Sequence, residues 1–208
     1  MALNLAPRIL LYPFGSAPPP LQEGWLALAQ WPDRDDAVFG DGSHPTTRLC
    51  AGALDLLCRQ RQAQAVLDVG TGRGVLARIA RARGARFVAG TDIDPVALAC
   101  ARADSELDAC PAAIHFSSAA PDQWGARFEL VIANILQSPL QRLAPALRSA
   151  LQPGGVLLLS GFMRSQTPGL RLLYEQTGLT FASESHLDEW ALLRFERPGR
   201  HRPQSASR

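Results

Sequence analysis

The sequence predicts an α/β protein built on a mostly parallel sheet. From about Val38, short apolar runs alternate with longer helical stretches, and Gly, Pro and Asp separate them. This alternation is typical of βαβ units. At 208 residues, with 47% apolar and 19% charged residues, the chain is long enough for one compact domain with a full core and too short for two large ones.

Five apolar runs are expected to form the parallel strands of the sheet. They cover residues 65–69, 87–91, 112–116, 130–133 and 156–161. Helix starts are expected where a capping residue precedes a proline, because the first helical position tolerates proline. Three pairs fit this rule, and we expect the last of the three helices to stop at Gly178: Asp94 with Pro95, Ser138 with Pro139, and Thr167 with Pro168.

The two ends of the chain differ from its middle. Residues 1–36 are rich in proline and are expected to be irregular, with a strand at 8–12 but no domain of their own. Residues 179–185 and 190–195 are strand-like and are expected to close the sheet as an antiparallel pair. We therefore expect a domain over residues 37–197, followed by a disordered basic tail at 198–208.

Charge and cysteine content exclude several function classes. The net charge is +2, but residues 197–208 carry four Arg, which leaves 17 basic against 19 acidic residues before them. The folded body thus gives no reason to expect a nucleic-acid partner. The four Cys and four His show no metal-ligand spacing. No export signal or apolar run long enough for a membrane is present, so we expect no metal site, no membrane contact, reduced thiols and a cytoplasmic location.

A glycine-rich loop follows the first buried run. It reads D-V-G-T-G-R-G over residues 68–74 and leads into a helix. Gly70 and Gly72 let the backbone approach a ligand, and the helix N-terminus presents free N–H groups. Asp92 ends the next strand, where a carboxylate can accept both hydroxyls of an adenosine ribose. The loop therefore predicts a nucleotide-like ligand.

Three features favour S-adenosylmethionine over NAD as that ligand. The glycines are spaced G-x-G-x-G, the sheet is expected to end in an antiparallel pair, and Asp68 precedes the loop, where it can meet a cationic amino group. At this point NAD or FAD, and a glycine turn without any ligand, both stay open.

Two more segments are expected at the same rim of the sheet. Residues 39–47 read F-G-D-G-S-H-P-T-T before a helix, and Asn134 follows the fourth parallel strand. Ligands of open parallel sheets bind outside the carboxyl ends of the strands. Asn occurs only twice in the chain, at positions 4 and 134, so its presence inside a motif is notable.

With these motifs, the sequence resembles bacterial PrmA-type protein lysine methyltransferases over about residues 8–195. The shared text, in the family's order, is F-G-x-G-x-H-P-T-T (39–47), L-D-V-G-x-G (67–72), D-I-D-P (92–95), A-N-I-L (133–136), P-G-G (153–155) and L-S-G (159–161). The family trimethylates the ribosomal protein at the base of the large-subunit stalk. Electron-transfer-flavoprotein lysine methyltransferases share many of these sequence motifs.

The resemblance implies a Rossmann-like class I methyltransferase fold with seven strands and helices on both faces. It implies S-adenosyl-L-methionine bound at the positions matching Thr47, Gly70, Asp92 and Asn134, and a protein substrate that offers a lysine or an N-terminal amine. The family's separate N-terminal substrate domain is expected to be missing, because residues 1–36 are too short for it. The family often has Thr, Cys and a small residue where this chain has Asp41, Thr71 and Arg73.

The expected chemistry assigns roles to two further side chains. The Asn134 oxygen can accept a hydrogen bond from an acceptor amine without favouring its ammonium form, as a carboxylate would. His44 is a candidate base, although its place before Pro45 equally suits a helix cap. Thr47 is expected to bond the cofactor carboxylate, Asp41 to bind a cationic substrate or stabilise a turn, and Arg73 to be exposed. Protein lysine methylation, a small-molecule acceptor and a non-catalytic relative stay open, as does the oligomeric state.

Overall fold

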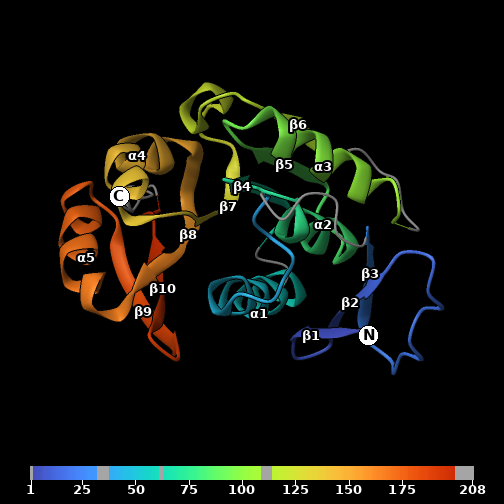
Figure 1. Cartoon of the computed structure of the whole chain (residues 1–208). Coiled ribbons are helices and arrows are strands. Elements are labelled where there is room, and N and C mark those ends of the chain that lie inside the picture. Colours follow the sequence, from blue (N-terminus) through green and yellow to red (C-terminus); the bar gives the residue numbers. More distant parts are fainter. Residues whose placement is uncertain (1, 32–37, 61–62, 109–113, 200–208) are drawn as a thin grey trace, which may run out of the picture.

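The structure, a computed structural model, describes residues 2–31, 38–60, 63–108 and 114–199 (Figure 1). The strands are β1 (Leu3–Ala6), β2 (Ile9–Pro13), β3 (Leu26–Gln30), β4 (Ala65–Val69), β5 (Phe87–Thr91), β6 (His115–Ser117), β7 (Phe128–Asn134), β8 (Leu151–Met163), β9 (Thr180–Leu187) and β10 (Trp190–Glu196). The helices are α1 (Pro45–Arg59), α2 (Val75–Ala82), α3 (Pro95–Ser105), α4 (Gln137–Ala150) and α5 (Thr167–Gln176), with 3₁₀ turns η1 (Pro121–Trp124) and η2 (Arg164–Gln166).

The main sheet has seven strands in the order β6-β5-β4-β7-β8-β10-β9. Strands β6, β5, β4, β7 and β8 pair in parallel, whereas β10 pairs antiparallel with both β8 and β9. The expected α/β fold with an antiparallel C-terminal pair is therefore confirmed. The strand order reverses beside β4, because β5 lies on one side of it and β7 on the other, which is where ligands bind in open α/β sheets.

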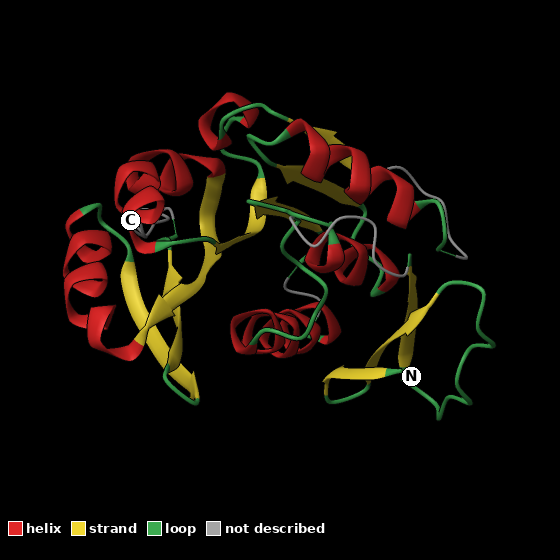
Figure 2. Cartoon of the chain, viewed as in Figure 1, coloured by secondary structure: helices red, strands yellow, loops and turns green. Residues whose placement is uncertain are grey.

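Helices cover both faces of this sheet (Figure 2). Successive residues of a strand point to opposite faces. In β7, Leu130 and Ile132 join a core with α1 and α2, while Val131 and Ala133 join a second core with α4 and α5. Both cores consist of fully buried apolar side chains, which explains why the central strands read as continuous apolar runs rather than alternating ones.

Each of the five predicted parallel strands overlaps a strand of the structure, and two of them have the predicted first and last residues. β4 and β5 have the expected bounds, while β7 and β8 extend beyond the expected runs at both ends. β6 begins at His115, and residues 112 and 113 of the expected run lie outside the described residues. The 3₁₀ turn η1 and the first residues of β8 have no apolar periodicity of their own, so the sequence pattern did not indicate them.

One of the three predicted helix caps is confirmed. The Asp94 side chain accepts a hydrogen bond from the backbone N–H two residues on. The cap at Ser138 is wrong, because α4 already begins after Leu136, and the Ser138 hydroxyl accepts from Arg142 inside the helix. The cap at Thr167 is also wrong: η2 leads directly into α5, so Thr167 has a helical backbone.

The N-terminal segment is more regular than expected. Three strands form a second sheet in the order β1-β2-β3, with β1 and β2 antiparallel and β2 and β3 parallel. The prediction of an irregular segment is thus wrong for these residues. Leu5, Ile9 and Leu28 are buried in the same core as α1 and α2, so this sheet packs on the main domain rather than standing apart. The division of the chain at residue 36 stays a prediction.

Arginines from the α2 region hold this small sheet in place. Arg78 pairs with Asp108 and donates to the Ala29 carbonyl at 2.5 Å. Arg83, at the C-terminal end of α2, donates to the Gly24 carbonyl at 3.0 Å. Buried backbone carbonyls such as that of Ala29 need donors, so the Arg78 side chain links strand β3 to helix α2. Within the parts of the chain that the structure describes, every helix is too short or too polar to cross a bilayer.

Candidate active site

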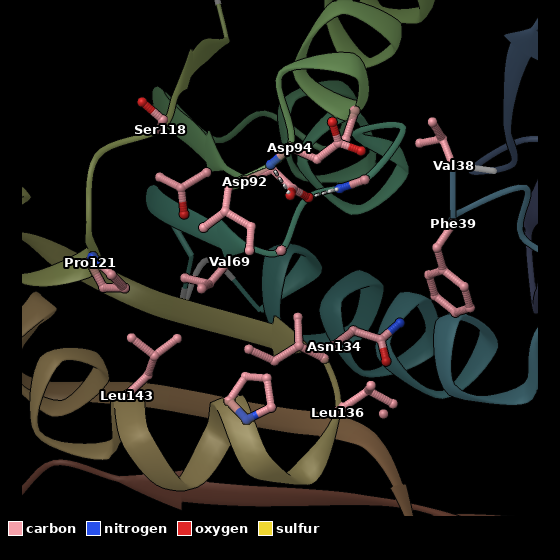
Figure 3. Close-up of a pocket in the computed structure, with 18 of the residues that line it drawn as sticks. Val38, Phe39, Val69, Asp92, Asp94, Ser118, Pro121, Asn134, Leu136 and Leu143 are labelled. Carbon is pink, nitrogen blue, oxygen red and sulfur yellow. Dashed lines mark hydrogen bonds between the residues drawn. The ribbon is translucent and has the colours of Figure 1, made fainter.

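A cavity of about 650 Å³ opens at the carboxyl ends of β4, β5 and β7 (Figure 3). The loops after these strands line it together with Val38, Phe39, His44 and Trp190. The lining is mainly apolar, with a few polar groups that converge from separate elements: His44, Thr46, Thr91, Asp92, Asp94, Ser118 and Asn134. An apolar cavity with few, convergent polar groups is typical of a small-molecule site.

The glycine loop is fixed to its neighbours by backbone bonds. The N–H groups of Gly70 and Thr71 both donate to the Thr91 carbonyl, at 2.8 and 2.9 Å. Gly72 has a φ of 53°, and a Cβ there would lie 2.3 Å from the Phe39 carbonyl oxygen. A side chain at this position is therefore excluded both by the backbone conformation and by the approach of residue 39.

Asp92 faces the cavity from the end of β5. One carboxylate oxygen accepts from the Gly72 N–H at 2.9 Å, and the other accepts from the Asp94 N–H at 3.0 Å; Figure 3 shows both bonds. These bonds orient the carboxylate, and each oxygen has a second lone pair for a ligand. Both oxygens can therefore still accept from a ligand, and the expected contact with two ribose hydroxyls stays a prediction.

Asp68 lies under the loop rather than in the cavity wall. One carboxylate oxygen accepts from the Thr71 hydroxyl at 2.7 Å and from the Ala77 N–H at 3.2 Å. The other oxygen is buried and has no partner among the described residues. Burial raises the pKa of Asp68 to about 6, although the two hydrogen bonds oppose the rise. Direct contact with a ligand therefore requires this side chain to move, and the structure leaves that expected contact as a prediction.

Replacement of Asp68 by asparagine should stabilise the protein at neutral pH. Because the pKa of about 6 in the folded state exceeds the ordinary carboxyl pKa of 3.8, the folded state binds more protons between these pH values and loses stability as the pH rises through this range. We expect Asp68→Asn to raise the free energy of unfolding by about 1–3 kcal/mol at pH 7.5, and by much less near pH 4.5. Urea unfolding at both pH values measures this, and an equal effect at both would contradict it.

Asn134 and Thr47 meet at the centre of the site. The Asn134 amide nitrogen donates to the Thr47 hydroxyl at 3.4 Å, and both side chains are nearly buried. The Asn134 amide oxygen is buried without a partner among the described residues. An unpaired buried acceptor is costly, so such an atom next to a cavity indicates a donor supplied by a ligand. Thr47 itself does not line the cavity, and its expected bond to the cofactor carboxylate stays a prediction.

His44 caps helix α1. Its Nδ1 accepts from the Thr46 N–H at 3.3 Å and lies 2.7 Å from the Thr46 hydroxyl. Burial lowers the pKa of His44, and nearby Asp41 opposes this only in part, so the neutral ring is favoured. With Nδ1 as acceptor, the ring proton lies on Nε2. The capping role is confirmed. In this tautomer Nε2 is a donor, and the expected role of His44 as a base stays a prediction.

The sequence did not indicate the aromatic wall beside His44. Trp190 lines the cavity, and its ring meets the His44 ring edge-on with 4.4 Å between the ring centroids. The Phe39 ring also meets the His44 ring edge-on, with 5.3 Å between the centroids. Phe39 belongs to the motif expected at this rim, whereas no local pattern marks Trp190, because it comes from the distant strand β10. The Asp41 carboxylate accepts from the backbone and the hydroxyl of Ser43, which stabilises a turn.

Arg73 differs most from expectation. The sequence predicted an exposed side chain, but Arg73 is only 7% exposed and pairs with Asp104 at 2.9 Å. The prediction failed because the partner lies 31 residues away along the chain, at the end of α3.

Comparison with known proteins gives consistent results. The family model described as "Ribosomal protein L11 methyltransferase (PrmA)" matches residues 36–198. The ribosomal protein L11 methyltransferase of Caulobacter sp. strain K31 is 37% identical over 165 residues, covering 78% of this chain and 57% of that protein. The one from Geobacter metallireducens is 42% identical over 161 residues, covering 76% and 52%. The chain therefore spans about half the length of these curated relatives.

A solved structure also matches nearly the whole chain. The crystal structure of a ribosomal protein L11 methylase from Lactobacillus delbrueckii subsp. bulgaricus superimposes with a TM-score of 0.80 at 25% identity. The match covers 95% of this chain and 98% of that one, so it includes most of the N-terminal three-stranded sheet as well as the main sheet.

Proposed function

Since the chain belongs to the ribosomal protein L11 methyltransferase family, we propose that it transfers methyl groups from S-adenosyl-L-methionine to an amine of a protein substrate, with a lysine side chain as the acceptor. The observation that carries this proposal is the unpaired Asn134 oxygen, buried at the cavity between the glycine loop and the aromatic wall. This oxygen is a neutral acceptor, and the N–H group of a bound substrate amine would supply its missing hydrogen bond.

The residues at the cavity fit the proposed methyl donor. Asp92 would bind the ribose hydroxyls, and Gly70 and Gly72 would let the backbone approach the ligand. The apolar side chains of Ile93, Pro121 and Leu143 offer a surface for an adenine ring. The negative charge of Asp68, directly below the loop, would favour a cationic amino group. When bound, S-adenosylmethionine supplies a methyl carbon that its positive sulfur already activates.

The chain's own residues then have three tasks in the proposed reaction. The apolar cavity favours the neutral form of a lysine amine, whose free pKa is about 10.4, and only that form has a lone pair. The Asn134 oxygen accepts a hydrogen bond from the amine and orients its lone pair. The walls exclude water and hold donor and acceptor together, an effect that can supply up to roughly 7–11 kcal/mol.

The acceptor's proton does not need a resident base. In the neutral tautomer, His44 Nδ1 is occupied by Thr46, and Nε2 carries a proton, so the ring cannot take a proton directly. We expect the lysine to lose its proton to solvent before or during entry. His44 would then donate from Nε2 or serve as a wall beside Trp190.

A labelling experiment tests the proposal. The chain is incubated with methyl-labelled donor and a proteome from cells that lack it, and mass spectrometry locates the label. Ribosomal protein L11, named in the relatives, is the first candidate substrate. Because the chain contains no Lys, any label on lysine belongs to a substrate and not to self-methylation. Label confined to small molecules would indicate a small-molecule acceptor, and no label at all would indicate a non-catalytic relative.

A further inference from the structure

We infer that the buried pair Arg73–Asp104 positions the Phe39 wall of the cavity. The two side chains meet bidentately, with Nε to Oδ2 at 2.9 Å and Nη2 to Oδ1 at 3.2 Å. Their side chains are 9% and 1% exposed. The two parallel hydrogen bonds between a guanidinium and a carboxylate in this geometry are strong and directional. Neither side chain lines the cavity, so any effect on the ligand must pass through other residues.

Arg73 and Asp104 contact the chain at Trp31, and Arg73 contacts it again at Phe39. Arg73 Nη2 donates to the Trp31 carbonyl at 2.9 Å, and Asp104 accepts from the Trp31 N–H at 3.3 Å. Eight residues later, the Arg73 backbone N–H donates to the Phe39 carbonyl at 3.2 Å. A Cβ on Gly40 would lie 3.3 Å from the same Arg73 nitrogen. Arg73 therefore holds the backbone at Phe39 with its own N–H and the backbone at Trp31 with its side chain.

The Phe39 side chain is poorly held by its own packing. It is 52% exposed although it forms part of the cavity wall, and its only ring contact among the described residues is with His44. Its position must then come largely from its backbone. The backbone contacts that fix it belong to Gly72 and Arg73, and the guanidinium of Arg73 is itself fixed by Asp104.

The energetic character of the pair supports a positioning role. A cation at a helix N-terminus is unfavourable, and α2 begins directly after this loop. Burying an ion pair gives little net stability compared with apolar residues, because both charges lose water. A pair with these costs, placed where it ties the glycine loop to the cavity wall, contributes more to local geometry than to global stability.

The chain contains a matched control in the pair Arg78–Asp108. Arg78 meets Asp108 at 2.9 and 2.6 Å, is 1% exposed, and donates to the Ala29 carbonyl. Arg78 also donates to the backbone of the small sheet, but its hydrogen bonds among the described residues reach no residue that lines the cavity. Loss of this pair should loosen β3 without moving Phe39.

The test compares two double variants, each of which replaces one ion pair by apolar residues. The first variant carries Arg73→Met and Asp104→Leu, and the second carries Arg78→Met and Asp108→Leu. The first readout is chymotrypsin cleavage after Phe39, which does not depend on any activity of the chain. We expect it to be about tenfold faster in the first variant and within about twofold of the parent in the second, because cleavage follows the population of the open segment. Thermal unfolding of both variants shows whether their global stabilities match.

The second readout is calorimetric affinity for S-adenosylhomocysteine, and it rests on the proposed function. We expect about five- to tenfold weaker binding for the Arg73 and Asp104 variant only, since its wall is no longer pre-organised. Should the parent chain not bind this ligand, the proposed function fails, while the cleavage result still decides the positioning role. If the first variant does not fold, Asp104→Asn alone, which keeps the size of the side chain, takes its place. Equal cleavage in both variants, or unchanged cleavage in the first, would overturn the inference.

Discussion

Methyl transfer should slow by about 10²–10³-fold when Asn134 is replaced by alanine, while affinity for S-adenosylhomocysteine falls by less than about tenfold. The reason is that the Asn134 oxygen, buried and unpaired at the cavity, has its proposed role with the acceptor amine. Truncation leaves the ribose contact of Asp92 and the glycine loop in place. Single-turnover rates with saturating donor, together with calorimetry, separate the two effects.

The charge at this position is tested by Asn134→Asp, which keeps the shape of the side chain. A carboxylate there favours the ammonium form of a lysine, so the remaining activity should require a higher pH than in the parent. Thr47 would still lie within reach to hold the new side chain. If Asn134→Ala instead lost ligand affinity and rate to the same extent, the residue would be a cofactor contact and not an orienting group.

Affinity for S-adenosylmethionine should fall by about 10²-fold or more when Asp92 is replaced by alanine, because two hydrogen bonds to a charged group are worth about 1.5–3 kcal/mol each. Asp92→Asn should be intermediate, since one acceptor oxygen remains. The measurement is isothermal titration calorimetry with S-adenosylmethionine. The oxygens of Asp92 also accept from Gly72 and Asp94, so thermal unfolding must show that the loop has kept its stability.

A suitable control for Asp92 is Asp122→Ala. Asp122 is an exposed acid on η1 that does not line the cavity, so its loss changes the net charge by the same amount without touching the site. The control variant should bind the ligand as the parent does. Equal loss of affinity in both variants would show that general electrostatics, rather than the ribose contact, attracts the ligand.

Much of the site could be predicted from the sequence, because its main elements are local. A glycine loop after an apolar strand, and an acid at the end of the next strand, each depend on a few adjacent residues. Parallel pairing then brings the strand ends to one edge. This logic placed Gly70, Gly72, Asp92 and Asn134 at one rim, and the structure lines a single cavity with all four. The same logic could not orient Asp68, whose side chain turns under the loop.

By itself, the sequence determined the α/β class, the strands and helices near the site, and the family, since these follow from hydrophobic period and short motifs. Only the tertiary structure decided which distant groups meet. It packed the N-terminal sheet into the main core, set Trp190 against His44, and buried Arg73 against Asp104. Such contacts depend on strand register, on side-chain direction and on packing between elements, and no spacing along the chain contains that information.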